Sequence, residues 1–144
     1  MLQRIQTLYL LLAVLLSGGL AFFVPFWSDA DGMPLGLIDM INGEDNLLII
    51  LPFTFILSGI LSLITLLLYK NRTKQIIYNR LNIVINFILL GIVVYYLLML
   101  PGEAEVSEKG IGVVIPLVVI VLLALANKAI IKDDKLVKSV DRLR

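Results

Sequence analysis

The stretch that decides the fold is a pair of long apolar runs separated by a short basic segment. Residues 47–69 read LLIILPFTFILSGILSLITLLLY, residues 70–80 read KNRTKQIIYNR, and residues 81–100 read LNIVINFILLGIVVYYLLML. Each run has about the 20 residues that a helix needs to cross a hydrocarbon core of roughly 30 Å. Long uniform runs indicate helices rather than the short alternating strands of a membrane barrel. The pattern therefore predicts a helical hairpin that crosses a membrane twice.

Two further apolar runs flank this hairpin, at residues 7–26 and residues 111–131. The chain is 60% hydrophobic with a mean hydropathy of +1.00, whereas a soluble domain contains about 45–50% apolar residues. The first run is longer than the apolar core of a cleaved signal peptide, which has about 7–15 residues, so we expect it to remain as a span. The sequence thus predicts a single membrane domain over residues 1–144, an all-α bundle of four transmembrane helices.

Basic and acidic residues sort to opposite sides of these spans. Eleven of the twelve Lys and Arg residues lie at the N terminus, within residues 70–80, or from Lys128 onward. The loops 28–46 and 101–110 carry eight Asp and Glu residues and only Lys109. The positive-inside rule predicts that the basic side is cytoplasmic, with both termini inside and these two loops outside. The acids lack the spacing of a calcium-binding loop, so we interpret the outer loops as solvated.

The tail at residues 132–144 changes character. Its apolar residues recur at helical spacing between charged ones, and Asp133 and Asp134 stand where the start of a new helix would favour acids. This pattern predicts a short amphipathic C-terminal helix, separate from the fourth span. We expect it to lie on the inner leaflet or under the bundle.

The composition excludes much of enzyme chemistry. The chain has no cysteine and no histidine, which removes disulfides, thiolate metal sites, and the commonest general base and metal ligand. Serines in the spans lack an adjacent base, and no span contains the carboxylate that proton-coupled exporters use. We expect no enzymatic activity, no cofactor and no metal. The basic residues have no context typical of nucleic-acid binding and are expected to attract anionic lipid instead.

Polar side chains within the spans are placed for contact between helices. Asn79, Asn82 and Asn86 share one face at the start of the third span. Ser58 and Ser62 are four residues apart in the second span, a spacing that lets two helix backbones approach closely. Helix packing is the favoured role, and contact with a substrate is the alternative. Whether the facing helix belongs to this chain or to another protein stays open.

Three polar segments resemble a known family. They are MLQRIQTLYL at residues 1–10, YKNR at residues 69–72 followed by Gln75, and KSVDRLR at residues 138–144. In these segments the chain resembles a family of uncharacterised four-span inner-membrane proteins of Bacteroidota, domain of unknown function 4293, over its whole length. The resemblance implies a bacterial inner membrane and brings no activity with it.

All three segments fall on the side predicted to be cytoplasmic. We therefore hypothesise a polar rim there, in which Asp141 pairs with Arg4 or Arg72 and either ties the tail to the bundle or receives a partner. Its predicted members are Gln3, Arg4, Gln6, Arg72, Asp141, Arg142 and Arg144.

The predicted function is that of a non-enzymatic membrane scaffold or accessory subunit of a larger inner-membrane complex. Such a protein would contact lipids and other integral membrane proteins through its helix faces and its rim. The alternative is a small oligomeric transporter or channel. In that case the polar path would be formed by Ser58, Ser62, Asn82 and Asn86.

Overall fold

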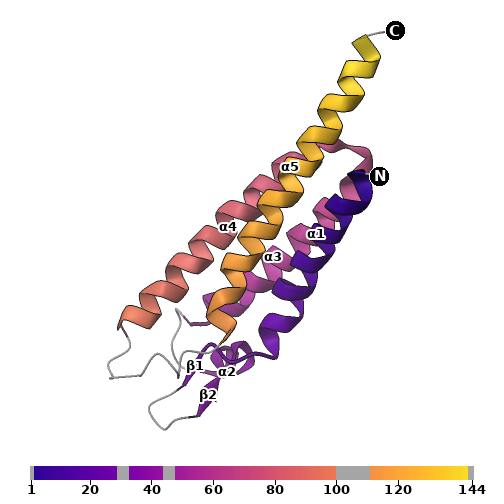
Figure 1. Ribbon diagram of the computed structural model, residues 1–144. Coiled ribbons are helices and arrows are strands. Elements are labelled where there is room, and N and C mark those ends of the chain that lie inside the picture. Colours follow the sequence, from indigo (N-terminus) through magenta and orange to yellow (C-terminus); the bar gives the residue numbers. More distant parts are fainter. Residues whose placement is uncertain (1, 29–32, 44–47, 100–110, 143–144) are drawn as a thin grey trace.

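The computed structural model describes residues 2–28, 33–43, 48–99 and 111–142. Its long helices are α1 (Leu2–Gly18), α3 (Ile50–Leu67), α4 (Arg72–Met99) and α5 (Ile115–Arg142). They provide four segments that are long and apolar enough to cross a membrane, and they lie side by side in Figure 1. The predicted all-α bundle of four membrane helices is confirmed.

Each long helix packs against two neighbours, in the cyclic order α1, α3, α4, α5. One end of the bundle, which we call the basic end, holds the start of α1 and the connection between α3 and α4 (Figure 1). The opposite end, the ribbon end, holds the strands β1 (Trp27–Ser28) and β2 (Pro34–Leu35) and the short helix α2 (Leu37–Asn42).

Buried residues recur along α3 and α4 at alternating intervals of four and three. This interval places side chains on one helix face, and it is the spacing of helices that pack at a shallow angle. The buried positions at this spacing are Leu51, Phe55, Ser58, Ser62 and Thr65 in α3, and Gln75, Asn79, Asn82, Asn86, Leu89 and Val93 in α4.

Helix α1 ends earlier than the run of apolar residues predicts. It stops at Gly18, and a 3-10 turn at Leu20–Phe22 follows. Gly19 departs from helical geometry with φ −122° and ψ −77°, although its N–H still donates to the carbonyl of Leu15 at 3.1 Å. Two successive glycines cost a helix about 1 kcal/mol each relative to alanine, which explains why the helix ends here.

The described part of the loop 28–46 is folded rather than simply solvated. Trp27 pairs with Leu35 and Ser28 with Pro34 in the antiparallel ribbon. The short helix α2 then buries Leu37 and Met40 against the bundle. These two apolar residues are three apart, so one turn of helix brings both to the same face. The acids at residues 29, 31, 44 and 45 and the loop 101–110 lie outside the described residues.

The tail is helical, but the prediction of a separate C-terminal helix is wrong. Helix α5 continues without a break from Ile115 to Arg142 and projects past the basic end of the bundle in Figure 1. No glycine or proline follows Pro116, so nothing in the sequence stops the helix at the end of the span. Asp133 and Asp134 form ion pairs within this helix and with α4 instead of starting a new helix.

Candidate functional site: a polar half-core and a basic end

Four of the predicted helix-packing residues form one network between α3 and α4. The side-chain amide of Asn82 donates to the Ser58 carbonyl at 3.0 Å and to Ser62 Oγ at 2.8 Å. The amide of Asn86 donates to Ser58 Oγ at 2.7 Å and to Asn82 Oδ1 at 3.1 Å. All four side chains are fully buried. The network therefore joins two helices of the same chain.

The fifth predicted residue, Asn79, reaches the other neighbour of α4. Its amide donates to the carbonyl of Leu123 in α5 at 2.8 Å, and its side chain is fully buried. One face of α4 thus hydrogen-bonds to α3 through Asn82 and Asn86 and to α5 through Asn79.

Three of the remaining polar residues in the core were not singled out for this role by their sequence pattern. Gln75 precedes Asn79 by one turn of α4, and Asn127 follows Leu123 by one turn of α5. Because α4 and α5 run in opposite directions, these two turns lie at the same level, nearer the basic end. Thr65 of α3 is buried and donates to the carbonyl of Leu61 at 2.7 Å. Gln75 could have been predicted from the sequence, because it lies four residues before Asn79 and continues the i, i+4 and i, i+3 series of the three asparagines.

Gln6 is also part of this core. The sequence pattern placed it in a polar rim, and only 2% of the residue is exposed. We call the buried polar residues, together with the half-buried Asn127, the polar half-core. Its members are Gln6 and Ser17 of α1, Ser58, Ser62 and Thr65 of α3, Gln75, Asn79, Asn82 and Asn86 of α4, and Asn127 of α5.

The polar half-core is rich in hydrogen-bond acceptors. Five buried amide oxygens have no hydrogen-bond partner among the described residues, and they belong to Gln6, Gln75, Asn79, Asn86 and Asn127. Amide groups do not titrate, so this set can accept hydrogen bonds but cannot act as a general acid or base. Among the described residues, no group of three or more His, Cys, Asp or Glu side chains is placed to hold a metal ion.

The other half of the core is apolar and lies toward the ribbon end. Beyond Asn86, the buried face of α4 continues as Leu89 and Val93, and α5 contributes Val119. An aromatic cluster of Phe26, Trp27, Phe55 and Tyr96 completes this end. The polar half-core therefore extends from the basic end to the middle of the bundle and is followed there by apolar packing.

The basic end is organised around an ion pair that the sequence did not predict. Arg72 Nη2 lies 3.1 Å from Asp133 Oδ2, with side chains 22% and 14% exposed. Asp141 was expected to pair with Arg4 or Arg72, and the ion pair that the structure describes at Arg72 is made by Asp133. The side chains of Gln3, Arg4, Asp141 and Arg142, and the whole of Arg144, lie outside the described residues, so the remainder of the predicted rim stays a prediction.

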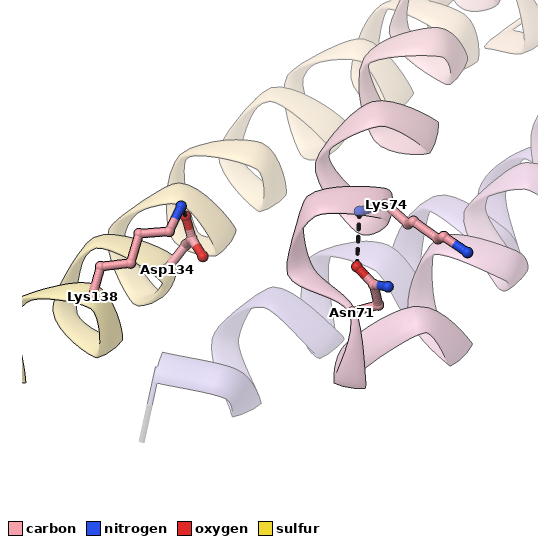
Figure 2. A network of polar contacts seen from close by, with 4 residues as sticks. All are labelled: Asn71, Lys74, Asp134 and Lys138. Carbon is pink, nitrogen blue, oxygen red and sulfur yellow. Dashed lines mark hydrogen bonds and ion pairs between the residues drawn. The ribbon is translucent and has the colours of Figure 1, made fainter. Parts of the chain in front are cut away.

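A second set of contacts fixes the local geometry at the basic end, and Figure 2 shows it. Asn71 Oδ1 accepts the backbone N–H of Lys74 at 3.3 Å, which satisfies one donor of the first turn of α4. On α5, Lys138 Nζ lies 2.6 Å from Asp134 Oδ2. Exposed pairs four residues apart contribute about 0.3–0.5 kcal/mol, so this pair orients charge more than it stabilises the fold.

The network between α3 and α4 leads to a stability prediction. We expect Asn82→Ala to lower the free energy of unfolding by about 1–2 kcal/mol, because it removes three hydrogen bonds between buried groups. Adding Ser62→Ala to that variant should cost little more, since the partner of Ser62 is already gone. Unfolding in mixed micelles at increasing denaturant would measure the wild type, the two single variants and the double variant, which together form a double-mutant cycle.

A matched control is Thr54→Ala. Thr54 Oγ1 donates to the Ile50 carbonyl of its own helix at 2.7 Å. We expect no coupling between Asn82→Ala and Thr54→Ala. Strictly additive losses for the Asn82 and Ser62 pair would contradict the observed network.

Comparison with known proteins gives one informative match. No curated protein and no solved structure matches the chain. The model of one family, described as domain of unknown function (DUF4293), matches residues 2–143. This match covers nearly the whole chain and every described helix. The chain therefore belongs to the DUF4293 family.

Proposed function

We propose that the chain is a non-enzymatic accessory subunit of a larger complex in a bacterial inner membrane, held to its partner by the projecting end of α5. The observation that carries this proposal is an uncovered apolar stripe on that segment. Leu136, Val137 and Val140 are 48%, 41% and 64% exposed. They lie at positions i, i+1 and i+4, on one face of the helix.

The length of α5 supports a position of this stripe outside the hydrocarbon. About 20 helical residues cross a core of roughly 30 Å, and α5 has 28 residues, preceded by a 3-10 turn at Ile111–Val114. The segment projects along the bundle instead of folding onto its end (Figure 1). An apolar stripe on a helix that stands in water fits a groove on another protein.

Charge favours a different protein over a second copy of this chain. The projecting segment carries Lys132, Lys135, Lys138 and Arg142 against Asp133, Asp134 and Asp141, which leaves it one net positive charge, and the neighbouring connection adds Lys70 and Lys74. Two copies in one membrane share the same orientation, so their projecting segments would bring like charges together. A partner with acidic groups around an apolar groove avoids this repulsion. The sorting of eleven of the twelve basic residues to this side supports its placement in the cytoplasm.

A small transporter or channel is the second candidate function. The observation that favours it is the polar half-core, whose buried amide oxygens would suit a solute rich in hydrogen-bond donors. The apolar half of the core and the aromatic cluster argue for the accessory subunit. A path for a solute through the whole bundle would have to push these packed side chains apart.

The proposal is tested by removing the stripe. We expect the double variant Val137→Ser and Val140→Ser to reduce recovery of the partner from native membranes by about tenfold or more, because burying a valine contributes about 1.5–3 kcal/mol. Mild extraction, followed by mass determination and identification of the proteins that co-purify, measures this loss.

The matched control is Lys135→Arg, which changes a side chain on the opposite face of the segment and keeps its charge. We expect this variant to retain the partner. Recovery of the wild-type chain alone, or only as a homo-oligomer, would contradict the accessory-subunit proposal. Flux into vesicles, with Asn86→Leu as the first variant, would then test the transporter.

A further inference from the structure

A pocket of about 480 Å³ opens at the basic end, where α3 passes into α4 beside α5. Its lining is rich in groups that donate hydrogen bonds: a phenol, an ammonium, an amide, a guanidinium and a hydroxyl. The residues are Tyr69, Lys70, Asn71, Arg72 and Thr73, with Asp134 as the one acid. The chemistry of the pocket is that of a site for an anion.

The charges around this pocket nearly balance. Asp134 of the lining forms an ion pair with Lys138 at 2.6 Å, and its neighbour Asp133 forms one with Arg72 at 3.1 Å. Lys70 forms no ion pair with any described residue, and its Nζ lies 5.9 Å from the centre of the Tyr69 ring. Among the residues that line the pocket, Lys70 and Arg72 against Asp134 leave one net positive charge. This balance matches the single negative charge of a phosphodiester better than the greater charge of inorganic phosphate at neutral pH.

The position of the pocket points to a lipid. The apolar segments Ile50–Lys70 and Arg72–Met99 meet at the pocket, so it lies at the level of the lipid headgroups. Leu67 and Ile77, which flank it on the side of the spans, are 64% and 60% exposed. An amphiphile whose phosphate occupies the pocket would lay its acyl chains against these side chains. A soluble anion would gain nothing from them.

We propose that this pocket binds the phosphodiester headgroup of an anionic glycerophospholipid, with Lys70 as its principal charge. The hydroxyls of Tyr69 and Thr73, the amide of Asn71 and the unused N–H groups of Arg72 donate to the phosphate oxygens. Basic pockets between membrane helices are suited to such headgroups. This site is independent of the partner proposed for the end of α5.

Native mass spectrometry of the purified intact chain in detergent tests the proposal. Phosphatidylglycerol and phosphatidylcholine serve as probes. We expect the wild type to prefer phosphatidylglycerol, and Lys70→Gln to weaken its binding about fivefold, the effect of one lysine at a membrane surface. Lys70→Arg should retain binding because it keeps the charge.

Lys74→Gln is the matched control. Lys74 lies in the same basic connection, but Figure 2 shows its side chain directed away from Asp134. We expect its loss to change the affinity less than about twofold, since exposed charges at a distance are screened by salt. Three results would overturn the proposal. These are equal binding of the two lipids, an equal loss in Lys74→Gln, or displacement of phosphatidylglycerol by an equal concentration of inorganic phosphate.

Discussion

Replacing Phe26 by alanine is expected to lower the free energy of unfolding by about 3–5 kcal/mol, the cost of emptying the place of a buried aromatic ring. Phe26 is fully buried at the ribbon end. Its ring centre lies 5.4 Å from that of Phe55 and 6.3 Å from that of Trp27, both in edge-to-face arrangements. Such pairs contribute about 0.5–1.5 kcal/mol beyond the buried area, and the substitution removes both.

The chain carries its own probe for this measurement. Trp27 is the single tryptophan, and it stacks on Tyr96 with ring centres 5.9 Å apart. Its fluorescence during unfolding in mixed micelles therefore reports on the aromatic cluster directly. Phe23→Ala is the matched control, because Phe23 is 84% exposed and we expect little change in stability. Similar losses for Phe23→Ala and Phe26→Ala would contradict this description of the ribbon end.

A glycine opposite the Phe26 ring sharpens the test. A Cβ added at Gly112 would lie 2.7 to 2.9 Å from three atoms of that ring, closer than side chains approach one another. The Gly112 N–H also donates to the Pro25 carbonyl at 3.1 Å, which holds the two segments together. We expect Gly112→Ala alone to cost about 1–3 kcal/mol by overpacking, and much less in the Phe26→Ala background, where the space is free.

Widening the contact between α1 and α3 has the second large effect. A Cβ at Gly59 would lie 3.1 Å from Gly18 Cα and 3.2 Å from Gly18 N. These are backbone atoms, so the helices themselves must separate. We expect Gly59→Leu to lower the free energy of unfolding by about 3 kcal/mol, the upper part of the usual range for overpacking. Denaturant unfolding in mixed micelles again measures the loss.

Gly91 provides the control for this substitution. It also lies within a long helix, but nothing lies within 4 Å of a Cβ built there. We expect Gly91→Leu to be neutral or to stabilise the protein by up to about 1 kcal/mol, because leucine favours helix more than glycine does. If Gly59→Leu and Gly91→Leu had the same effect, the close approach of Gly18 and Gly59 would not be limiting for stability.

The four helices could be predicted because each carries its own evidence. A run of about 20 apolar residues requires no knowledge of its neighbours to be recognised as a span. The end of α1 was missed although Gly18 and Gly19 signal it locally. The course of α5 was missed for the opposite reason. Asp133 and Asp134 fit a new helix start as well as an unbroken helix, and the partner Arg72 lies 61 positions earlier in the chain.

The burial of the aromatic residues also depends on segments that are distant in the sequence and could not be predicted from their own apolar runs. Aromatic side chains are common at the lipid interface, and the sequence places Phe26, Trp27 and Phe55 at the outer ends of the first two apolar runs. The first two are buried because β1 and α2 fold back over the bundle, and an apolar run does not reveal that return. For the candidate site, spacing alone identified Asn79, Asn82 and Asn86 as one face. The partner of each amide, a carbonyl or a hydroxyl, depends on how far the two helices are shifted along their axes relative to each other. No local sequence pattern determines that shift.

The shortness of the connection between α3 and α4 has a consequence for biosynthesis. Only Asn71 separates the 3-10 turn Leu68–Lys70 from α4. Alone in lipid, α4 would expose several amide groups that lack water, at a considerable cost per group. The ribosome delivers α3 first, so Ser58 and Ser62 are already at hand when Asn82 and Asn86 emerge. We therefore expect the hairpin, rather than the single helix, to be the unit that the insertion machinery releases into the bilayer.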